Sequence, residues 1–200
     1  MDSSSTIIDH IQTNCLEDGK SALAYYYFDF NEPTKQKAAK FLSSVIAQLC
    51  FQCSVLPDGV KRLYQRCNDG NQTPTWKDLL TALKGSLEGL ENAFIVADAV
   101  DECPKDNNER EDLLKIVNSV HGWANSSLHL LTTSRRETDI ESALAPLLCL
   151  PAISIGSAQV DADIKVYVKS ELERLSKEKR WPRDLAIEIE DTLVRGATGM

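Results

Sequence analysis

The chain has 200 residues, with 22 Lys+Arg against 30 Asp+Glu and a formal net charge of -8. This length suits one domain, or one domain with part of a second, and 42% hydrophobic residues exclude wholesale disorder. An acidic chain lacks the basic face that phosphate-backbone binding needs, so the composition argues against a nucleic-acid partner. No apolar run approaches the roughly 20 residues of a membrane span, and the first residues carry no signal-peptide pattern, so we expect a cytoplasmic protein without a membrane partner.

The six cysteines are too sparse for a disulfide scaffold, and we interpret them as reduced thiols. Cys50 and Cys53 form a CxxC pair at the end of an apolar helical run. A zinc site needs four ligands, and this pair has neither a second CxxC nor a histidine nearby. We therefore expect packed thiols at these positions rather than a metal site.

Apolar runs alternate with amphipathic patterns along the chain, which indicates strands connected by helices. In chain order we expect a helix within Ser3 to Gln12, a strand from Ala22 to Phe30, a helix opened by Pro33 and Thr34, a short helix from Asp58 to Arg66, a helix after a capping box of Thr75 and Asp78, a strand from Ala93 to Ala97, a helix opened by Asp106 to Asn108, a strand from Leu128 to Thr132, a further strand within Leu147 to Ile155, a long helix after Ser157 and a last helix after Pro182. Such alternation is typical of an α/β domain with a parallel sheet, expected here over residues 1–156 and followed by a helical region over 157–200.

The segment AFIVADAVDEC (93–103) places acidic residues directly after an apolar strand: Asp98 ends the strand, and Asp101 and Glu102 follow. Ligands of open parallel sheets bind beyond the carboxyl ends of the strands. A carboxylate at that place can hold a hydrated Mg²⁺ beside a triphosphate, and a second carboxylate can orient the attacking water. The pattern therefore predicts a Walker B element with Asp98 at the metal and Asp101 and Glu102 at the water.

The next expected strand, LHLLT (128–132), is followed after two residues by Arg135 and Arg136. An arginine at the end of a neighbouring strand can reach the γ-phosphate of a bound nucleotide and sense its hydrolysis. We assign this nucleotide-sensing role to Arg135, with Arg136 as the less favoured substitute.

Four stretches of the chain together resemble a NACHT-type P-loop NTPase of the STAND class, and more narrowly the nephrocystin-like N-terminal NTPase domains abundant in filamentous fungi. They are YYYFDFNEPTKQKAAKFLSSVIAQL, FIVADAVDECP, LHLLTTSRRETDIE and WPRDLAIEIEDTLVRGATGM. The resemblance implies a three-layer sandwich around a parallel sheet. It also implies a large cytosolic signalling switch that couples binding and hydrolysis of ATP or GTP, with Mg²⁺, to oligomerisation. Many members of the family carry ankyrin or other repeats after this module.

The resemblance implies a role for each acid and for one arginine. Asp98 resembles the Walker B aspartate that holds Mg²⁺ through water, and Asp101 and Glu102 resemble the acidic pair that supports hydrolysis. Arg135 resembles the sensor arginine after the next strand. Asp29, at the end of the first expected strand, is interpreted as a structural loop contact.

The family's phosphate-binding loop, G-x-x-x-x-G-K-[ST], does not occur in the sequence. The one Gly-Lys-Ser triplet (19–21) has Asn14 where the motif needs its first glycine, and it follows a helix instead of a strand. The segment MDSSSTIIDHI resembles the helix that comes just after the loop in the family, so we expect the loop and the preceding strand to be missing and the carboxyl terminus to be cut. Such a chain is expected to be poorly stable and not to bind an NTP tightly.

The sequence leaves two alternatives to the NTPase function open and argues against a third. A degenerate NACHT fragment can act as a non-catalytic interaction module that binds itself or a full-length relative, or it can be the remnant of a decaying gene. A caspase-like Cys/His enzyme built on Cys50 and His121 has the wrong order, because that family places its histidine before its cysteine.

Overall fold

The computed structural model describes residues 3–16, 20–123, 127–153, 165–175 and 183–197. The chain divides into two compact units, Met1–Leu148 and Cys149–Met200. The first unit holds the sheet, and the described part of the second holds two helices. The domain boundary expected between residues 156 and 157 lies outside the described residues.

Three parallel strands form the sheet of the first unit, in the order β1-β2-β3. They are β1 (Ser21–Tyr27), β2 (Asn92–Asp98) and β3 (Leu128–Thr132). The register sets Ala24 beside Ile95 and Ile95 beside Leu130. The predicted α/β class with a parallel sheet is thereby confirmed, and the carboxyl ends of all three strands meet at the same end of the sheet.

Helices connect the strands where the apolar spacing predicts them. In the first unit these are α1 (Ser3–Asn14), α2 (Ala38–Gln52), α3 (Asp58–Arg66), α4 (Trp76–Ser86), α5 (Glu109–His121) and α6 (Thr138–Leu144), with 3₁₀ turns η1 (Pro33–Lys35), η2 (Val100–Glu102), η3 (Asp106–Asn108) and η4 (Ala145–Leu147). The capping box predicted before α4 is present, because Thr75 Oγ1 accepts the Asp78 amide proton and the Asp78 carboxylate accepts the Thr75 amide proton.

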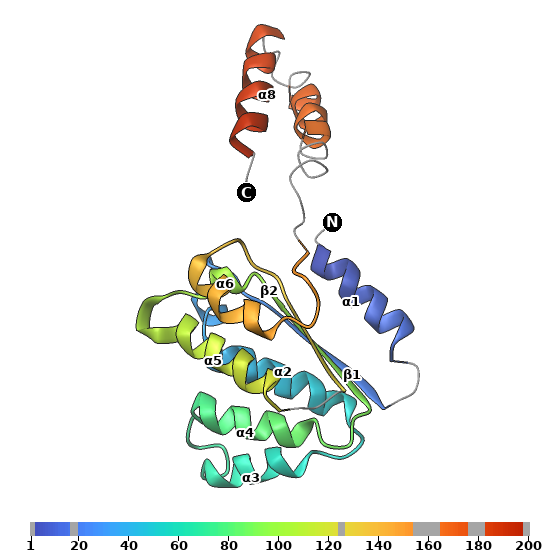
Figure 1. Cartoon of the computed structure of the whole chain (residues 1–200), viewed down its shortest axis with the longest axis vertical. Coiled ribbons are helices and arrows are strands. Elements are labelled where there is room, and N and C mark those ends of the chain that lie inside the picture. The colour runs from blue at the N-terminus through green and yellow to red at the C-terminus, as the bar shows by residue number, and fades with distance from the viewer. Residues whose placement is uncertain (1–2, 17–19, 124–126, 154–164, 176–182, 198–200) are drawn as a thin grey trace. The chain divides into compact units, whose positions relative to one another are not determined.

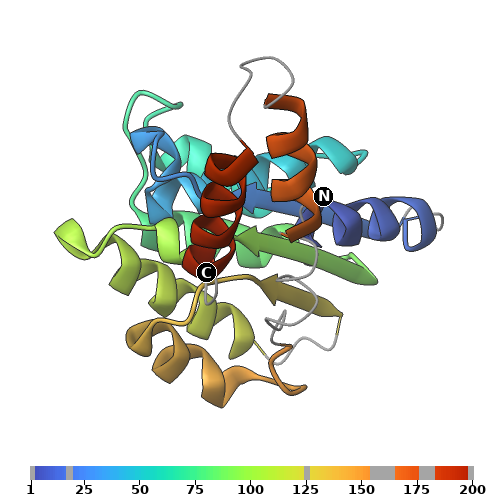
Figure 2. The same ribbon diagram turned by 90° about the horizontal axis from the view of Figure 1, so that it is seen from above.

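The sheet has helices on both faces (Figures 1 and 2). The face that carries Ala24, Tyr26 and Ile95 joins the main core with side chains of α2, α4 and α5. The large side chains of these three helices that are almost fully buried in this core are Leu42, Val45, Leu49, Leu83, Leu113 and Ile116. On the opposite face α1 supplies Ile8 and Ile11, which pack with Leu23 and Val96 in a smaller cluster. Alternate residues of β1 and β2 thus serve two cores, which explains their nearly continuous apolar sequence.

Helices α3 and α4 approach closely through two glycines. A Cβ on Gly59 would lie 3.3 Å from the Ala82 carbonyl oxygen and 3.3 Å from the Gly85 Cα atom, both of which are backbone atoms. Neither contact could be relieved by turning a side chain, so the two helices pack at this distance because both positions lack a side chain.

The strand expected within Leu147 to Ile155 is wrong over the residues that the structure describes. After η4, residues 148–153 form neither helix nor strand, and residues 154 and 155 lie outside the described residues. Leu150 and Ile153 are 79% and 90% exposed. Pro151 removes a backbone donor from this run, so its apolar composition does not make it a ladder strand.

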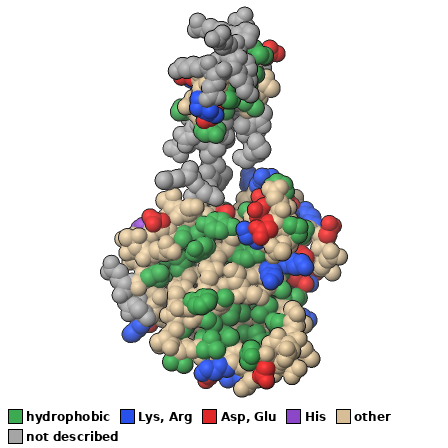
Figure 3. Space-filling view, turned by 180° about the vertical axis from the view of Figure 1, so that it is seen from behind, with side chains coloured by type: hydrophobic (Ala, Val, Ile, Leu, Met, Phe, Trp, Pro, Cys, Tyr) green, Lys and Arg blue, Asp and Glu red, His purple; other side chains and the backbone are tan. Residues whose placement is uncertain are grey.

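The described part of the second unit contains two helices, over residues 165–175 and in α8 (Arg183–Ala197). They agree with the two helices expected after Ser157 and after Pro182, although residues 157–164 lie outside the described residues. Leu172 is buried, whereas Val166 and Tyr167 on the same helix are exposed. Figure 3 shows hydrophobic side chains on the surface of the first unit as well.

Candidate functional site

The candidate site lies where β2 and β3 end. β2 ends at Asp98, and Thr133 follows the last residue of β3. The start of α1 reaches the same place, because the Ser4 hydroxyl donates a hydrogen bond to Asp98 Oδ1. Three segments far apart in the sequence therefore meet at one carboxylate.

Asp98 is held by two hydroxyl groups. Thr133 Oγ1 donates to Asp98 Oδ1 at 2.6 Å, the same oxygen that accepts from Ser4. Ser4 itself is 1% exposed. Within the part of the chain that the structure describes, no residue donates a hydrogen bond to Asp98 Oδ2. Two hydroxyl groups of the protein thus fix the orientation of this carboxylate through one of its oxygens.

The chain makes a sharp turn directly after Asp98. Ala99 adopts the left-handed conformation, with φ 54° and ψ 50°, which costs a residue with a side chain about 1–2 kcal/mol. Thr133 holds this turn: its Oγ1 accepts the Ala99 amide proton at 3.0 Å and its carbonyl accepts the Val100 amide proton at 2.9 Å. The turn directs Asp101 back toward the residues that follow β3.

Asp101 and Arg135 meet across the two strand ends. Asp101 Oδ1 accepts the Arg135 amide proton at 2.9 Å, and Asp101 Oδ2 lies 3.7 Å from Arg135 Nε. The Asp101 side chain is 7% exposed, whereas that of Arg135 is 71% exposed. The structure therefore brings together these two sequence-predicted residues, with the acid buried and the guanidinium group turned toward solvent.

Glu102 points toward a different neighbour. Its Oε2 accepts the amide proton of Phe30 at 3.0 Å, in the loop that follows β1. The same loop is shaped by Asp29, whose Oδ1 accepts the Asn31 amide proton at 2.8 Å. Asp29 thus makes the structural loop contact that the sequence predicts, while Glu102 connects the acidic turn to that loop.

Arg110 is the buried cation behind the acidic turn. It is 5% exposed, and its Nε donates to the Cys103 carbonyl oxygen at 2.7 Å. Its two terminal nitrogens donate to the Asp101 carbonyl oxygen and to Glu137. Arg110 therefore joins the acidic turn after β2 to the start of α6, which follows β3.

Glu137 is shared by two cations, since Lys105 Nζ also lies 2.9 Å from its carboxylate. Hydrogen bonds from Lys105 and from Arg110 hold the pKa of Glu137 below its usual value. Burial has a different effect on the neighbouring thiol: it raises the pKa of Cys103 to about 12. Cys103 is fully buried and donates to the Gln36 carbonyl oxygen at 3.2 Å, so it is a packed group beside the site.

Several sequence candidates lie outside this arrangement. Arg136, the substitute for Arg135, pairs with Glu141 at 3.4 Å and is 87% exposed. Lys20 of the Gly-Lys-Ser triplet forms an exposed ion pair with Glu91, before β2 begins and therefore at the other end of the sheet. Cys50 and Cys53 are free thiols, as are the other four cysteines.

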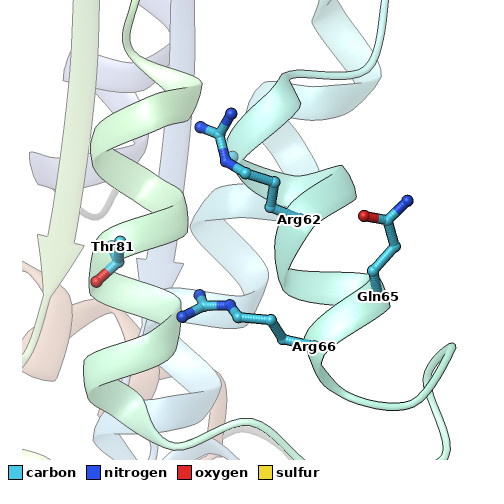
Figure 4. A pocket seen from close by; sticks show the side chains of 5 residues that line it. Arg62, Gln65, Arg66 and Thr81 are labelled. Carbon is cyan, nitrogen blue, oxygen red and sulfur yellow. The ribbon is translucent and has the colours of Figure 1, made fainter.

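A hollow between α3 and α4 is also separate from the site. It is lined by Gly59, Arg62, Gln65, Arg66 and Thr81 (Figure 4). Arg66 lies 3.8 Å from the Asp78 carboxylate, and none of these residues belongs to a strand end. This hollow carries two arginines but no group of the Asp98 arrangement.

Three residues of the site were missed in the sequence. Ser4 lies in a run of serines at the start of a helix, Thr133 follows a strand, and Arg110 occupies a helix position that reads as surface. Ser4 had no specific signal, because a serine at the start of a helix usually serves only as a cap. Arg110 had none, because its burial results from contacts with distant segments.

The Asp98 carboxylate and the nearby hydroxyl groups suit Mg²⁺ only if waters and substrate phosphates supply the other ligands. A single carboxylate with a neighbouring hydroxyl is too small a set to hold the ion by protein ligands alone. Mg²⁺ usually keeps several waters and is bound by one or two carboxylates together with substrate phosphates. Over the described ranges no group of three His, Cys, Asp or Glu side chains has the placement of a metal site, so a dedicated protein cage is not what these residues build.

Comparison with known proteins gives one match. The family model described as Nephrocystin 3, N-terminal, matches residues 3–135, which is 133 of the 200 residues. No curated protein and no solved structure matches the chain. None of the helices in the described part of the chain is long and apolar enough to cross a membrane. The matched range begins at the start of α1 and ends at Arg135. It therefore contains Asp98 and the residues that surround it at the strand ends, which are Ser4, Asp101, Thr133 and Arg135.

Proposed function

Because the chain belongs to the nephrocystin 3 N-terminal family, we propose that it carries the metal-binding and hydrolysis half of a NACHT-type NTPase site. The parent activity is a cytoplasmic signalling switch of the STAND class, in which hydrolysis of ATP or GTP is coupled to oligomerisation. The single observation that carries the proposal is the hydrogen bond between the Ser4 hydroxyl and Asp98 at the carboxyl end of β2.

Asp98 has a known chemical use in such a setting. In P-loop NTPases Mg²⁺ is held by the Ser or Thr of the G-x-x-x-x-G-K-[ST] loop and by an aspartate at the end of a neighbouring strand. The buried Ser4 lies in the segment that resembles the helix after that loop, so its role here is to orient Asp98. Ser4 is near the start of α1, and Asp98 is the last residue of β2. Asp98 would help to hold the ion when a nucleotide is bound, and the ion would supply positive charge against the charge that develops in the transition state.

Asp101, Glu102 and Arg135 are the candidates for the other roles in hydrolysis, next to the metal position at Asp98. Asp101 is buried and fixed by the Arg135 amide, so its orientation is set before any ligand binds. The exposed Arg135 guanidinium group lies beside it, in place to approach a terminal phosphate. Asp101 and Glu102 are the candidates for orienting the attacking water, with Asp101 the better placed because Glu102 is engaged by the Phe30 amide.

The chain by itself is expected to bind NTPs weakly and to show no turnover. The sequence contains no G-x-x-x-x-G-K-[ST], so no loop of glycine amides and no lysine cover the phosphates. A titration of the chain with fluorescent ATP and GTP analogues in Mg²⁺ should give dissociation constants of about 1 mM or weaker.

The proposal is tested in an extended chain, in which a strand and a G-x-x-x-x-G-K-[ST] loop from a NACHT-type relative are joined ahead of Ser4. We expect this chain to release phosphate from ATP or GTP. Asp98→Asn should lower the rate by about 100-fold or more, because it removes the charge that holds the ion. Asp29→Asn is the matched control: it changes an acid after the neighbouring strand that contacts only its own loop, and the rate should stay within about twofold.

Two results would contradict the assignment. One is an extended chain that binds nucleotide and hydrolyses it equally fast with Asp98 or with Asn at that position. The other is an extended chain that folds, as shown by circular dichroism, but does not bind nucleotide, since residues 3–135 would then not complete such a site.

A further inference from the structure

Thr133 joins the segment after β3 to the segment after β2 through its backbone. Its amide donates to the Ala97 carbonyl oxygen at 3.0 Å, and its carbonyl oxygen accepts the Val100 amide proton at 2.9 Å. In the sequence, these two partners lie on either side of Asp98. The backbone of Thr133 is therefore fixed to the β2 segment before its side chain makes any contact.

The Thr133 hydroxyl has one proton, and two partners determine where it points. Its Oγ1 accepts the Ala99 amide proton at 3.0 Å and donates to Asp98 Oδ1 at 2.6 Å. Because an amide N–H can only donate, the hydroxyl proton is directed to the carboxylate. The orientation of the Asp98 carboxylate thus depends on the position of Thr133, as it does on Ser4 of α1.

Arg135 lies two residues after Thr133 in the same connection. Its amide donates to Asp101 Oδ1 at 2.9 Å, so its backbone is held against a side chain that is 7% exposed. Its guanidinium group is 71% exposed and reaches solvent. The segment 133–135 therefore carries the bond to the metal carboxylate at one end and the exposed cation at the other.

We infer that Thr133 is a positioning residue that couples Asp98, the metal carboxylate, to Arg135, the sensor arginine. The inference rests on the proposed function, because it concerns the regulation of that same site. One short stretch of chain makes both contacts, so a displacement of Arg135 when a terminal phosphate is bound or lost also displaces the hydroxyl that orients Asp98. Mg²⁺ demands near-ideal octahedral geometry, so a turned carboxylate holds it less well.

Amide hydrogen exchange of the full chain, measured by NMR without nucleotide, tests the contact itself. Thr133→Val removes the hydroxyl with little change in shape, so the Ala99 amide loses its acceptor and should exchange about tenfold faster or more. The Val100 amide keeps its backbone acceptor and should stay protected. Thr133→Ser retains the hydroxyl and should restore the protection of Ala99.

Thr132→Val is the matched control. It makes the same chemical change one residue earlier, at a hydroxyl that makes no hydrogen bond within the part of the chain that the structure describes. It should leave the Ala99 exchange rate unchanged. Should Thr133→Val fail to fold, as judged by circular dichroism, Thr133→Ala takes its place, because its smaller side chain also lacks the hydroxyl and lets water reach the Ala99 amide.

The coupling is tested in the extended chain that carries the phosphate-binding loop, by measuring phosphate release against Mg²⁺ concentration. Thr133→Val should raise the Mg²⁺ concentration at half-maximal rate by about tenfold, whereas nucleotide affinity without metal stays the same. Thr133→Ser should recover the Mg²⁺ requirement of the parent, and Thr132→Val should not alter it.

Arg135→Ala distinguishes coupling from simple electrostatics. Loss of a nearby positive charge by itself favours a bound cation. If Thr133 couples the two residues, Arg135→Ala should instead raise the Mg²⁺ requirement by about threefold or more, and it should lose this effect when Thr133 is replaced by valine.

Three results overturn the inference. They are an Ala99 exchange rate that Thr133→Val leaves unchanged, an active extended chain in which Thr133→Val needs no more Mg²⁺ than the parent, and an Arg135→Ala variant whose Mg²⁺ requirement is equal to that of the parent or lower. An extended chain that is inactive in every form contradicts the proposed function and the coupling with it. Failure of the inference alone is therefore distinguished from failure of the proposed function.

Discussion

Replacing Arg110 by methionine should destabilise the first unit more than any other single change to its charged residues. The guanidinium group is 5% exposed and donates to two backbone carbonyls, those of Asp101 and Cys103, as well as to Glu137. Methionine fills much of the same volume but leaves both carbonyls unsatisfied. A buried polar group without its partner costs about 1–3 kcal/mol.

The expected loss in free energy of unfolding is about 3 kcal/mol. Two carbonyls set the scale, and the lost ion pair adds little because Glu137 keeps Lys105 and is about one-third exposed. For a unit of this size, about 3 kcal/mol corresponds to a fall of roughly 6–12 °C in Tm. Urea titration and thermal melting, both followed by far-UV circular dichroism, measure the two quantities.

A matched control separates burial from charge. Arg136→Met makes the same chemical change at a residue that is 87% exposed and pairs with Glu141 at the surface, and it should cost less than about 0.5 kcal/mol. Arg110→Lys keeps the charge but cannot reproduce the planar fork, so it should recover less than half of the loss. An Arg110→Met variant within about 1 kcal/mol of the parent would refute the role given to this residue.

Three further predictions concern other parts of the first unit. Thr75→Ala removes the capping box of α4 and should lower the free energy of unfolding by about 1 kcal/mol in urea titration, whereas an unchanged midpoint would contradict the cap. Cys103 should react with iodoacetamide at pH 8 about 10–100-fold more slowly than a thiol of ordinary pKa 9.0, because its pKa is raised to about 12 and the higher nucleophilicity of its thiolate offsets part of the loss; peptide mapping that finds Cys103 modified as fast as the exposed Cys149 would count against this. The Glu137 pKa is lowered on folding, so its contribution is present above the ordinary pKa and is lost as the pH falls through the lowered one. The difference in free energy of unfolding between the parent and Glu137→Gln should therefore shrink as the pH falls from about 6 to about 3. A difference that grows in acid would contradict the lowered pKa.

Much of the fold follows from short-range patterns. α3 and β3 have the predicted bounds, because each is an isolated periodic run between turn residues. The strand predicted after Pro146 was wrong for a physical reason. Buried strands and exposed segments can have the same apolar composition, and only a neighbouring strand to pair with distinguishes the two. No spacing rule predicts which apolar run finds a neighbouring strand.

The candidate site was predictable in part. Asp98, Asp101 and Arg135 were found because parallel strands end together, so residues that follow two strands lie close in space. The contacts of Ser4, Thr133 and Arg110 depend on the exact path of the turn at Ala99 and on the packing of α1 and α5. Those features arise from tertiary contacts, and they decide that Asp101 is buried and Glu102 is bound to a neighbouring loop.

The binding of Mn²⁺ to the extended chain with saturating ATP or GTP, measured by electron paramagnetic resonance, tests the central claim most directly. If Asp98 holds the ion of a bound nucleotide, Asp98→Asn should weaken Mn²⁺ binding by about 10–100-fold while nucleotide affinity without metal stays the same. Equal Mn²⁺ affinity in the parent and in Asp98→Asn would contradict the account.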